Sequence, residues 1–210
     1  MTVSVTIRPV LEAIDLECRR GGRLLFRELS FAIAGGELLR VAGANGRGKT
    51  SLLRILCGLL QPILGEVRWK GSPVLSLREE FSRVLVHVGH APAVKDDLTA
   101  AENLSMALRI AGNRRSDIEV HTALLKLDVP VDAVLRKLSQ GQRRRATLAR
   151  LLLSEAVPLW FLDEPFASLD AAATREVEGL MSEHVARGGA VVYTTHQESR
   201  LQARAVDLDA

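Results

Sequence analysis

The chain has few of the features that mark secreted, membrane-spanning or disulfide-stabilised proteins. Its 210 residues include only two cysteines, Cys18 and Cys57, whose spacing suits neither a disulfide framework nor a metal site. No apolar run approaches the roughly 20 residues that a helix needs to cross a bilayer. Residues 1–8 contain no basic segment followed by a long apolar core, so we expect no secretion signal. These absences favour a protein of the reducing cytosol.

A large excess of charge of one sign is also lacking. The net charge is +3 and no long block of like charges occurs, although the pI is about 9.2. Dedicated nucleic-acid-binding proteins concentrate basic residues in a patch or arm, so we expect no nucleic-acid partner. Hydrophobic residues make up 47% and charged residues 25%, which is ordinary for a globular chain, and the length suits one domain over 1–210.

A glycine-rich stretch over residues 43–51 fits the pattern G-x-x-x-x-G-K-[ST] at every fixed position. A mostly apolar strand is expected before it at 37–42 and a helix after it at 51–56, and this context argues against a chance turn that contains a lysine. Glycines let the backbone N–H groups point inward, and the helix N-terminus adds an anion site. Lys49 suits the β- and γ-phosphates, and the Thr50 hydroxyl suits Mg²⁺. The predicted nucleotide-binding residues here are Gly43, Ala44, Asn45, Gly46, Arg47, Gly48, Lys49, Thr50 and Ser51.

The rest of the chain alternates strand and helix patterns, which predicts an α/β fold with a mostly parallel core sheet. The first 35 or so residues are expected to form β-hairpins, with separate strands at 24–26 and 29–33. A helical block at about 93–156 is expected as a subdomain inserted into this core, with a capping box formed by Thr99 and Glu102. The expected core strands are 84–88, 157–162 and 190–194, and the expected helices are 102–127 with a break at 112–113, 143–153 and 171–184.

Polar side chains follow two of the buried strands. Asp163 and Glu164 come directly after the strand at 157–162, and His196 follows the strand at 190–194. Ligands of open α/β sheets bind beyond the carboxyl ends of the strands, so these side chains are expected near the glycine-rich stretch. Asp163 would then share Mg²⁺ with Thr50, directly or through a water, and Glu164 would act as general base on a water. The alternative for the acidic pair is a solvated strand end.

The order of these motifs resembles that of the ATP-binding cassette ATPases over nearly the whole chain. After the glycine-rich stretch come residues 138–142, 162–165, 168–170 and 195–196. The resemblance implies an ATP hydrolase with ATP and Mg²⁺ as cofactors, in which two copies join head to tail around ATP. It implies that Ser139 and Gly141 contact the nucleotide held by the second copy. Its implied catalytic residues are Lys49, Glu164 as base and His196 as switch histidine, and its implied dimer-interface residues are Ser139, Gln140, Gly141, Gln142 and Asp170.

Within this family the chain is similar to the ATP-binding subunit of the haem exporter of cytochrome c maturation. The most discriminating segment is Gly-His-Ala-Pro at 89–92, supported by 98–104 and 163–170. The resemblance implies separate integral membrane subunits that ATP-driven dimerisation would power. It places the chain peripherally on the cytoplasmic face of the inner membrane. No C-x-x-C-H motif for haem occurs. The alternatives are the ATPase subunit of another exporter, a non-transport cassette ATPase and a regulatory nucleotide-binding subunit.

The sequence departs from the family pattern at several positions. Ala91 stands where a metal- and water-sensing glutamine is usual, and Ala44 replaces a common proline. Arg19 and Arg20 stand near the position of the aromatic residue that often stacks on adenine, and a guanidinium plane can also stack. The run 143–145 consists of three arginines, read either as a solvated helix face or as a contact with the dimer or membrane partner.

Overall fold

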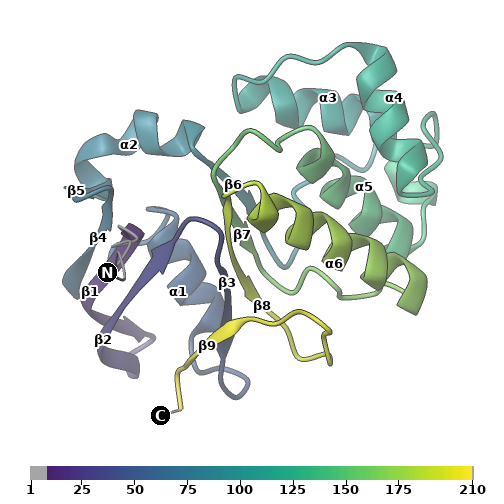
Figure 1. Cartoon of the computed structure of the whole chain (residues 1–210). Helices are drawn as coiled ribbons and strands as arrows, with labels where there is room; N and C mark the ends of the chain where they lie inside the picture. Colours follow the sequence, from purple (N-terminus) through teal and green to yellow (C-terminus); the bar gives the residue numbers. More distant parts are fainter. Residues whose placement is uncertain (1–8, 210) are drawn as a thin grey trace, which may run out of the picture.

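The computed structural model describes residues 9–209, so the expectation about a secretion signal at residues 1–8 lies outside the described residues. The described chain forms two β-sheets with helices packed around them (Figure 1). The strands are β1 (Pro9–Arg20), β2 (Arg23–Ala34), β3 (Leu38–Ala42), β4 (Leu64–Trp69), β5 (Ser72–Pro73), β6 (Leu85–Val88), β7 (Leu159–Leu162), β8 (Ala190–Thr194) and β9 (Arg204–Asp207). The helices are α1 (Lys49–Leu56), α2 (Val74–Arg83), α3 (Ala100–Ile110), α4 (Asp117–Lys126), the short 3₁₀ helix η1 (Leu135–Lys137), α5 (Gln140–Leu152) and α6 (Ala171–Ala186).

The five-stranded sheet carries the functional strand ends. Its order is β6-β7-β8-β3-β9, and every neighbouring pair is parallel. All residues of β7 and β8 are buried, as expected for strands covered on both faces. Because β7, β8 and β3 are neighbours and run the same way, the glycine-rich stretch, the acidic pair and His196 all follow strands at one edge of the sheet.

The four-stranded sheet has the order β2-β1-β4-β5 and is antiparallel. Separate strands were expected at 24–26 and 29–33, but β2 is a single strand of 12 residues. Glu28 has a φ of 52°, and the register with β1 shifts nearby, so an irregularity lets the strand continue where the apolar pattern breaks.

Helix α2 and strand β9 are among the elements that the sequence did not predict. Helix α2 follows Pro73 and is kinked at Arg78, whose φ of 18° lies outside the helical region, so its apolar period is broken. Strand β9 has a single buried residue, Val206, and its place at the sheet edge comes from pairing with β3. Long-range pairing of this kind leaves little trace in a local pattern.

Helices α3, α4 and α5 pack against one another to one side of the parallel sheet (Figure 1). The capping box of Thr99 and Glu102 is present at the start of α3, as expected. Ser139 and Gln142 form another at the start of α5. No helix among residues 9–209 is long and apolar enough to cross a membrane.

A buried histidine lies between α6 and the parallel sheet. The His184 ring stacks on Trp160, with centroids 3.8 Å apart and planes 7° apart. Its side chain is 1% exposed, and within the described chain neither ring nitrogen has a partner in hydrogen-bond geometry. A Cβ on Gly189 would lie 2.1 Å from His184 Nε2, so only glycine fits beside the ring. Burial lowers the pKa of His184 to about 4, and the Pro158 carbonyl offsets this only in part.

We expect this histidine to make stability depend on pH. Below pH 6.5 the unfolded chain protonates the imidazole, whereas the folded chain resists protonation until about pH 4. The free energy of unfolding should therefore be unaffected above pH 6.5 and fall by about 3 kcal/mol as pH decreases toward 4. Urea unfolding of the wild type and of His184→Phe between pH 7 and 4 measures this. An equal slope for both proteins would contradict the assignment to His184.

Candidate active site

The glycine-rich stretch wraps around the first turn of α1. Gly48 stands before the helix with a φ of 105°, and a Cβ there would lie 3.0 Å from Leu25 Cβ, so a side chain would be strained and crowded. Within the described residues no side chain caps this helix, which leaves its first N–H groups facing the loop. Lys49 is 8% exposed, and its Nζ donates to the carbonyls of Gly43 at 2.7 Å and Ala44 at 3.1 Å. The ammonium group is thus held over an anion-binding turn.

The carboxylate of Asp209, which follows β9, also bonds the glycine-rich stretch. Asp209 Oδ2 accepts a hydrogen bond of 2.6 Å from the Ala44 N–H, and its Oδ1 pairs with the Arg47 guanidinium. Arg47 also donates to the Leu208 carbonyl at 3.2 Å. The Ala44 N–H, followed by Arg47, lowers the pKa of Asp209. Proline at position 44 would have no N–H to donate, so this contact exists because the chain departs from the usual pattern.

Asp163 links the loop to β8. Its Oδ2 accepts from the Thr50 hydroxyl at 2.8 Å, and its Oδ1 accepts from the Thr194 hydroxyl at 2.8 Å. Asp163 is 2% exposed and Thr194 is fully buried. Thr194 Oγ1 also accepts the Glu164 N–H at 2.9 Å, so one hydroxyl orients both acidic residues. The sequence placed Thr194 only at the end of a strand and missed this role.

Glu164 and His196 meet beside this network. Glu164 Oε2 accepts the His196 backbone N–H at 3.3 Å, and the imidazole Nε2 lies 3.6 Å from Glu164 Oε1. Glu164 has a φ of 51°, which is rare for a residue with a side chain. Such strain persists where the surroundings fix the conformation, and it often accompanies function. The backbone that follows β7 and β8 therefore fixes the orientation of the Glu164 carboxylate.

These residues line one cavity of about 520 Å³. Its lining includes Asn45, Gly46 and 48–51 of the glycine-rich stretch, together with Arg20 and His90. The predicted residues Gly43, Ala44 and Arg47 are not part of the lining. The strand ends contribute Asp163, Glu164 and His196 to the same wall. The structure thus brings together the residues that were predicted from three separate motifs. Of the two arginines that the sequence suggested for adenine stacking, Arg20 lines the cavity and Arg19 does not, and Ala91 is not part of the lining.

We expect Thr194→Val to impair both stability and hydrolysis. Valine has a similar shape but leaves Asp163 Oδ1 and the Glu164 N–H without their partner, which should cost about 2 kcal/mol of unfolding free energy. Loss of this alignment should lower the rate of ATP hydrolysis about 10-fold or more. Urea unfolding and steady-state hydrolysis measure the two effects. Thr194→Ser keeps the hydroxyl and serves as the control, so equal losses in both variants would contradict the role of the hydroxyl.

The predicted dimer-interface residues lie away from this cavity. Ser139 caps α5 by accepting the Gln142 N–H at 3.2 Å, and the Gln142 side chain accepts the Ser139 N–H at 3.0 Å. A Cβ on Gly141 would lie 2.7 Å from the Ser168 carbonyl, so glycine allows the loop at 168–170 to approach. Asp170 caps α6 through the Ala173 N–H at 2.8 Å, and that bond lowers its pKa. Neither Ser139 nor Gly141 lines the cavity of its own chain.

Comparisons with known proteins show the family of the chain. The family model described as ABC transporter matches residues 26–167, about two thirds of the chain. The chain belongs to the ABC transporter family. A cytochrome c biogenesis ATP-binding export protein, CcmA, of Aromatoleum aromaticum is 51% identical over 193 residues, which cover 91% of this chain and 90% of that protein. The protein of the same description from Nitrosospira multiformis is 46% identical over 200 residues, with 94% and 97% covered. The resemblance drawn from the motifs is confirmed.

Solved structures of ABC proteins share the fold. A putative ABC transporter ATP-binding protein from Pyrococcus furiosus has a TM-score of 0.80 at 23% identity, covering 95% of this chain and 97% of its own. An ATP-binding cassette in a dimeric post-hydrolysis state has a TM-score of 0.77 at 22% identity, covering 89% and 88%. The predicted α/β ABC fold with a parallel core sheet and an antiparallel part is therefore confirmed.

One interpretation made for this ABC chain was wrong. The solvated face predicted for the arginine run at 143–145 is wrong for Arg144, which is 3% exposed. The other suggestion, a contact with a partner, does not fit this residue either, since its guanidinium donates to carbonyls of its own chain at Gly89 and at Asp163–Pro165. A run of three arginines alone cannot indicate which one turns inward.

Proposed function

We propose that the chain is the ATP-hydrolysing subunit of an export complex of cytochrome c maturation, in which haem or a haem carrier is the cargo. The family and the names of the relatives support the ATPase and export parts. The main observation behind the proposed chemistry is the position of Asp163. Its carboxylate bonds to Thr50 of the glycine-rich stretch 43–51, called the phosphate loop below, and to Thr194, which also bonds Glu164.

The binding step uses the glycine-rich loop and α1. The backbone N–H groups at residues 45–48 and Lys49 suit the phosphates of ATP, whereas the Ala44 N–H is bonded to Asp209. The Thr50 hydroxyl and the Asp163 carboxylate offer the oxygen ligands that Mg²⁺ prefers, Asp163 directly or through a water. Residues 9–209 offer no group of three or more His, Cys, Asp or Glu side chains arranged to hold a metal ion. The Thr50 hydroxyl and the Asp163 carboxylate, together with the nucleotide, are the proposed cation site. A bound Mg²⁺ would neutralise the charge that develops on the phosphates.

The hydrolytic step uses Glu164 and His196. The Glu164 carboxylate is held beside the cavity, where it can accept a proton from a water that attacks the γ-phosphorus. His196 lies within 3.6 Å of that carboxylate and lines the same cavity, so it can donate a hydrogen bond to the γ-phosphate while its backbone N–H orients Glu164. Lys49 supplies positive charge to the same phosphate.

A complete site requires a second copy of the chain. Ser139, Gln140, Gly141, Gln142 and Asp170 lie at or beside the starts of α5 and α6 and do not line the chain's own cavity. The N-terminus of α5, capped by Ser139, offers N–H groups to an anion brought by a partner. We therefore place ATP between the phosphate loop of one copy and Ser139 and Gly141 of the other, in a dimer that hydrolysis releases.

We further propose one domain over 1–210, with the helical block at 93–156 as an inserted subdomain. Integral membrane subunits of the cytochrome c maturation complex would be the partners, with the chain bound peripherally at the cytoplasmic face of the inner membrane. The names of the relatives as export proteins support this placement.

Affinity capture tests the assignment. A tagged chain carrying Glu164→Gln is isolated from membranes in mild detergent with ATP present, and co-purifying proteins are identified by mass spectrometry. Integral membrane proteins of cytochrome c maturation are the expected result. A different permease would retain the ATPase and overturn the haem assignment, whereas no membrane partner would favour a non-transport or regulatory ATPase.

A further inference from the structure

The N-terminal half of α5 is joined to the segment after β7 by one buried side chain, Arg144. Arg144 Nη2 donates to the carbonyls of Asp163 at 2.7 Å and Glu164 at 2.8 Å, and Nε donates to Pro165 at 3.3 Å. Its Nη1 donates to the Gly89 carbonyl at 2.8 Å, on the loop that carries His90 and follows β6. One guanidinium thus connects two loops that border the cavity to the helix that Ser139 caps.

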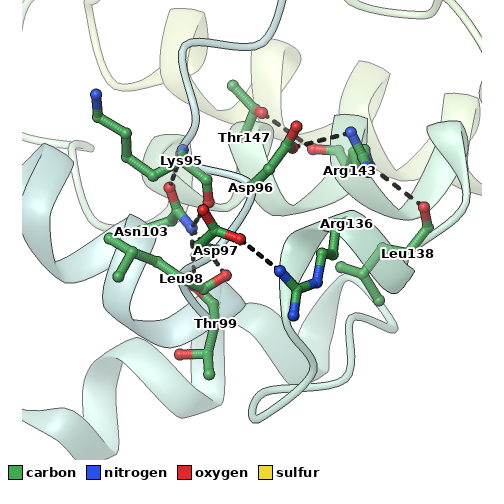
Figure 2. A network of polar contacts seen from close by, with 10 residues as sticks. All are labelled: Lys95, Asp96, Asp97, Leu98, Thr99, Asn103, Arg136, Leu138, Arg143 and Thr147. Carbon is green, nitrogen blue, oxygen red and sulfur yellow. Dashed lines mark hydrogen bonds and ion pairs between the residues drawn. The ribbon is translucent and has the colours of Figure 1, made fainter.

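The neighbouring residue, Arg143, attaches the same part of α5 to the segment that contains Asp96. Arg143 donates to Asp96 at 3.0 Å and to the Leu138 carbonyl at 3.3 Å, as Figure 2 shows. The segment with Asp96 is itself held by the buried Asn103, whose side chain bonds the Lys95 N–H and carbonyl (Figure 2). Both ends of the stretch 89–96 are therefore attached to α5, by Arg144 at Gly89 and by Arg143 at Asp96.

The arrangement needs arginine in particular. A guanidinium presents five N–H donors in a rigid planar fork, whereas lysine carries its three donors on a single nitrogen. Burial lowers the pKa of Arg144 to about 10, and the nearby Asp163 and Glu164 oppose this, so the group stays charged at neutral pH. Four carbonyls receive a charge-assisted bond from it, and removal would leave them without that donor.

We propose that Arg144 is a positioning residue for hydrolysis, which fixes Glu164 and the Gly89 loop of one chain relative to its own Ser139. In the proposed dimer, Glu164 serves the nucleotide of its own chain, and Ser139 serves the nucleotide of the partner. Arg144 therefore makes the geometry of the two composite sites interdependent. This inference rests on the proposed ATPase function and adds a residue to it that contacts neither nucleotide.

Two variants of Arg144 and one control test the proposal. Arg144→Met removes the donors, and Arg144→Lys keeps the charge with fewer directions of donation. Arg187→Met makes the same change in an exposed residue at the end of α6, whose only ion pair among the described residues is with Glu183 at 3.7 Å. Rates are expressed per ATP-binding site, measured by stoichiometric titration with a non-hydrolysable ATP analogue, so that unfolded protein does not contribute.

We expect kcat per site to fall at least 10-fold in Arg144→Met and less in Arg144→Lys, with KM for ATP within 3-fold of wild type. Arg144 does not touch the phosphate loop, so binding should be retained. A merely structural role would reduce the number of binding sites and leave kcat per site unchanged, and that result would overturn the proposal.

A second measurement separates this inference from the proposed function. In the Glu164→Gln background, light scattering follows dimer formation with ATP. At saturating ATP we expect Glu164→Gln to dimerise, and the double variant with Arg144→Met to need at least a 10-fold higher protein concentration for half-dimerisation. Failure of Glu164→Gln itself to dimerise would contradict the proposed dimer, whereas equal dimerisation of both proteins would contradict the role of Arg144.

Discussion

ATP hydrolysis is expected to fall at least about 100-fold when Glu164 is replaced by glutamine, because a positioned general base contributes about 10²- to 10⁴-fold. Glutamine has nearly the same shape, and its side-chain oxygen can still accept the His196 N–H that the carboxylate now accepts at 3.3 Å. It cannot take a proton from water at neutral pH. Binding of ATP should therefore persist while turnover stops, and an ATP-bound dimer should accumulate.

Steady-state phosphate release and light scattering with saturating ATP and Mg²⁺ measure these effects. Glu155→Gln is the matched control, since Glu155 is exposed in the loop before β7, at the end of the strand opposite Glu164. Hydrolysis by Glu164→Gln within a few-fold of wild type would exclude Glu164 as the base. A monomer at saturating ATP would contradict the head-to-tail dimer.

The second large effect is expected at Lys49, which the binding step needs. Lys49→Met removes an ammonium group that the fold keeps 8% exposed above the phosphate loop. Charge-assisted bonds contribute about 1.5–3 kcal/mol each, so the loss of contacts to two phosphates should weaken ATP binding by at least about 100-fold. Hydrolysis should then disappear because the substrate is not held.

Equilibrium binding of a fluorescent ATP analogue tests this prediction. Arg54→Met removes a long basic side chain from the exposed face of the same helix and should bind as wild type does. Circular dichroism checks that Lys49→Met is folded, since the lysine also bonds the carbonyls of Gly43 and Ala44. A dissociation constant within 3-fold of wild type would exclude Lys49 from the binding site.

The parts of the site that the sequence could predict are those with short, local patterns. The glycine spacing predicts the phosphate loop. The acidic pair and His196 directly follow apolar runs that predict buried strands. The parallel order of the strands then places them at one sheet edge without any knowledge of side-chain contacts.

The supporting residues could not be predicted because their partners lie far away in the sequence. Thr194 is 31 residues from Asp163, and Asp209 is 165 residues from Ala44. In the sequence, Arg144 cannot be distinguished from the arginines on either side of it. In the structure its guanidinium donates to a carbonyl 55 residues earlier and to carbonyls about 20 residues later.

The attachment of Asp209 to the phosphate loop has a consequence for protein synthesis. The ribosome makes the loop early, but the carboxylate that accepts the Ala44 N–H, and the β9 strand that pairs with β3, come near the end of the described chain. Domains fold during synthesis from the N-terminus onward, so the nascent chain exposes this loop before its support exists. The completed loop, and with it tight capture of ATP, should appear only once translation of these last residues has finished.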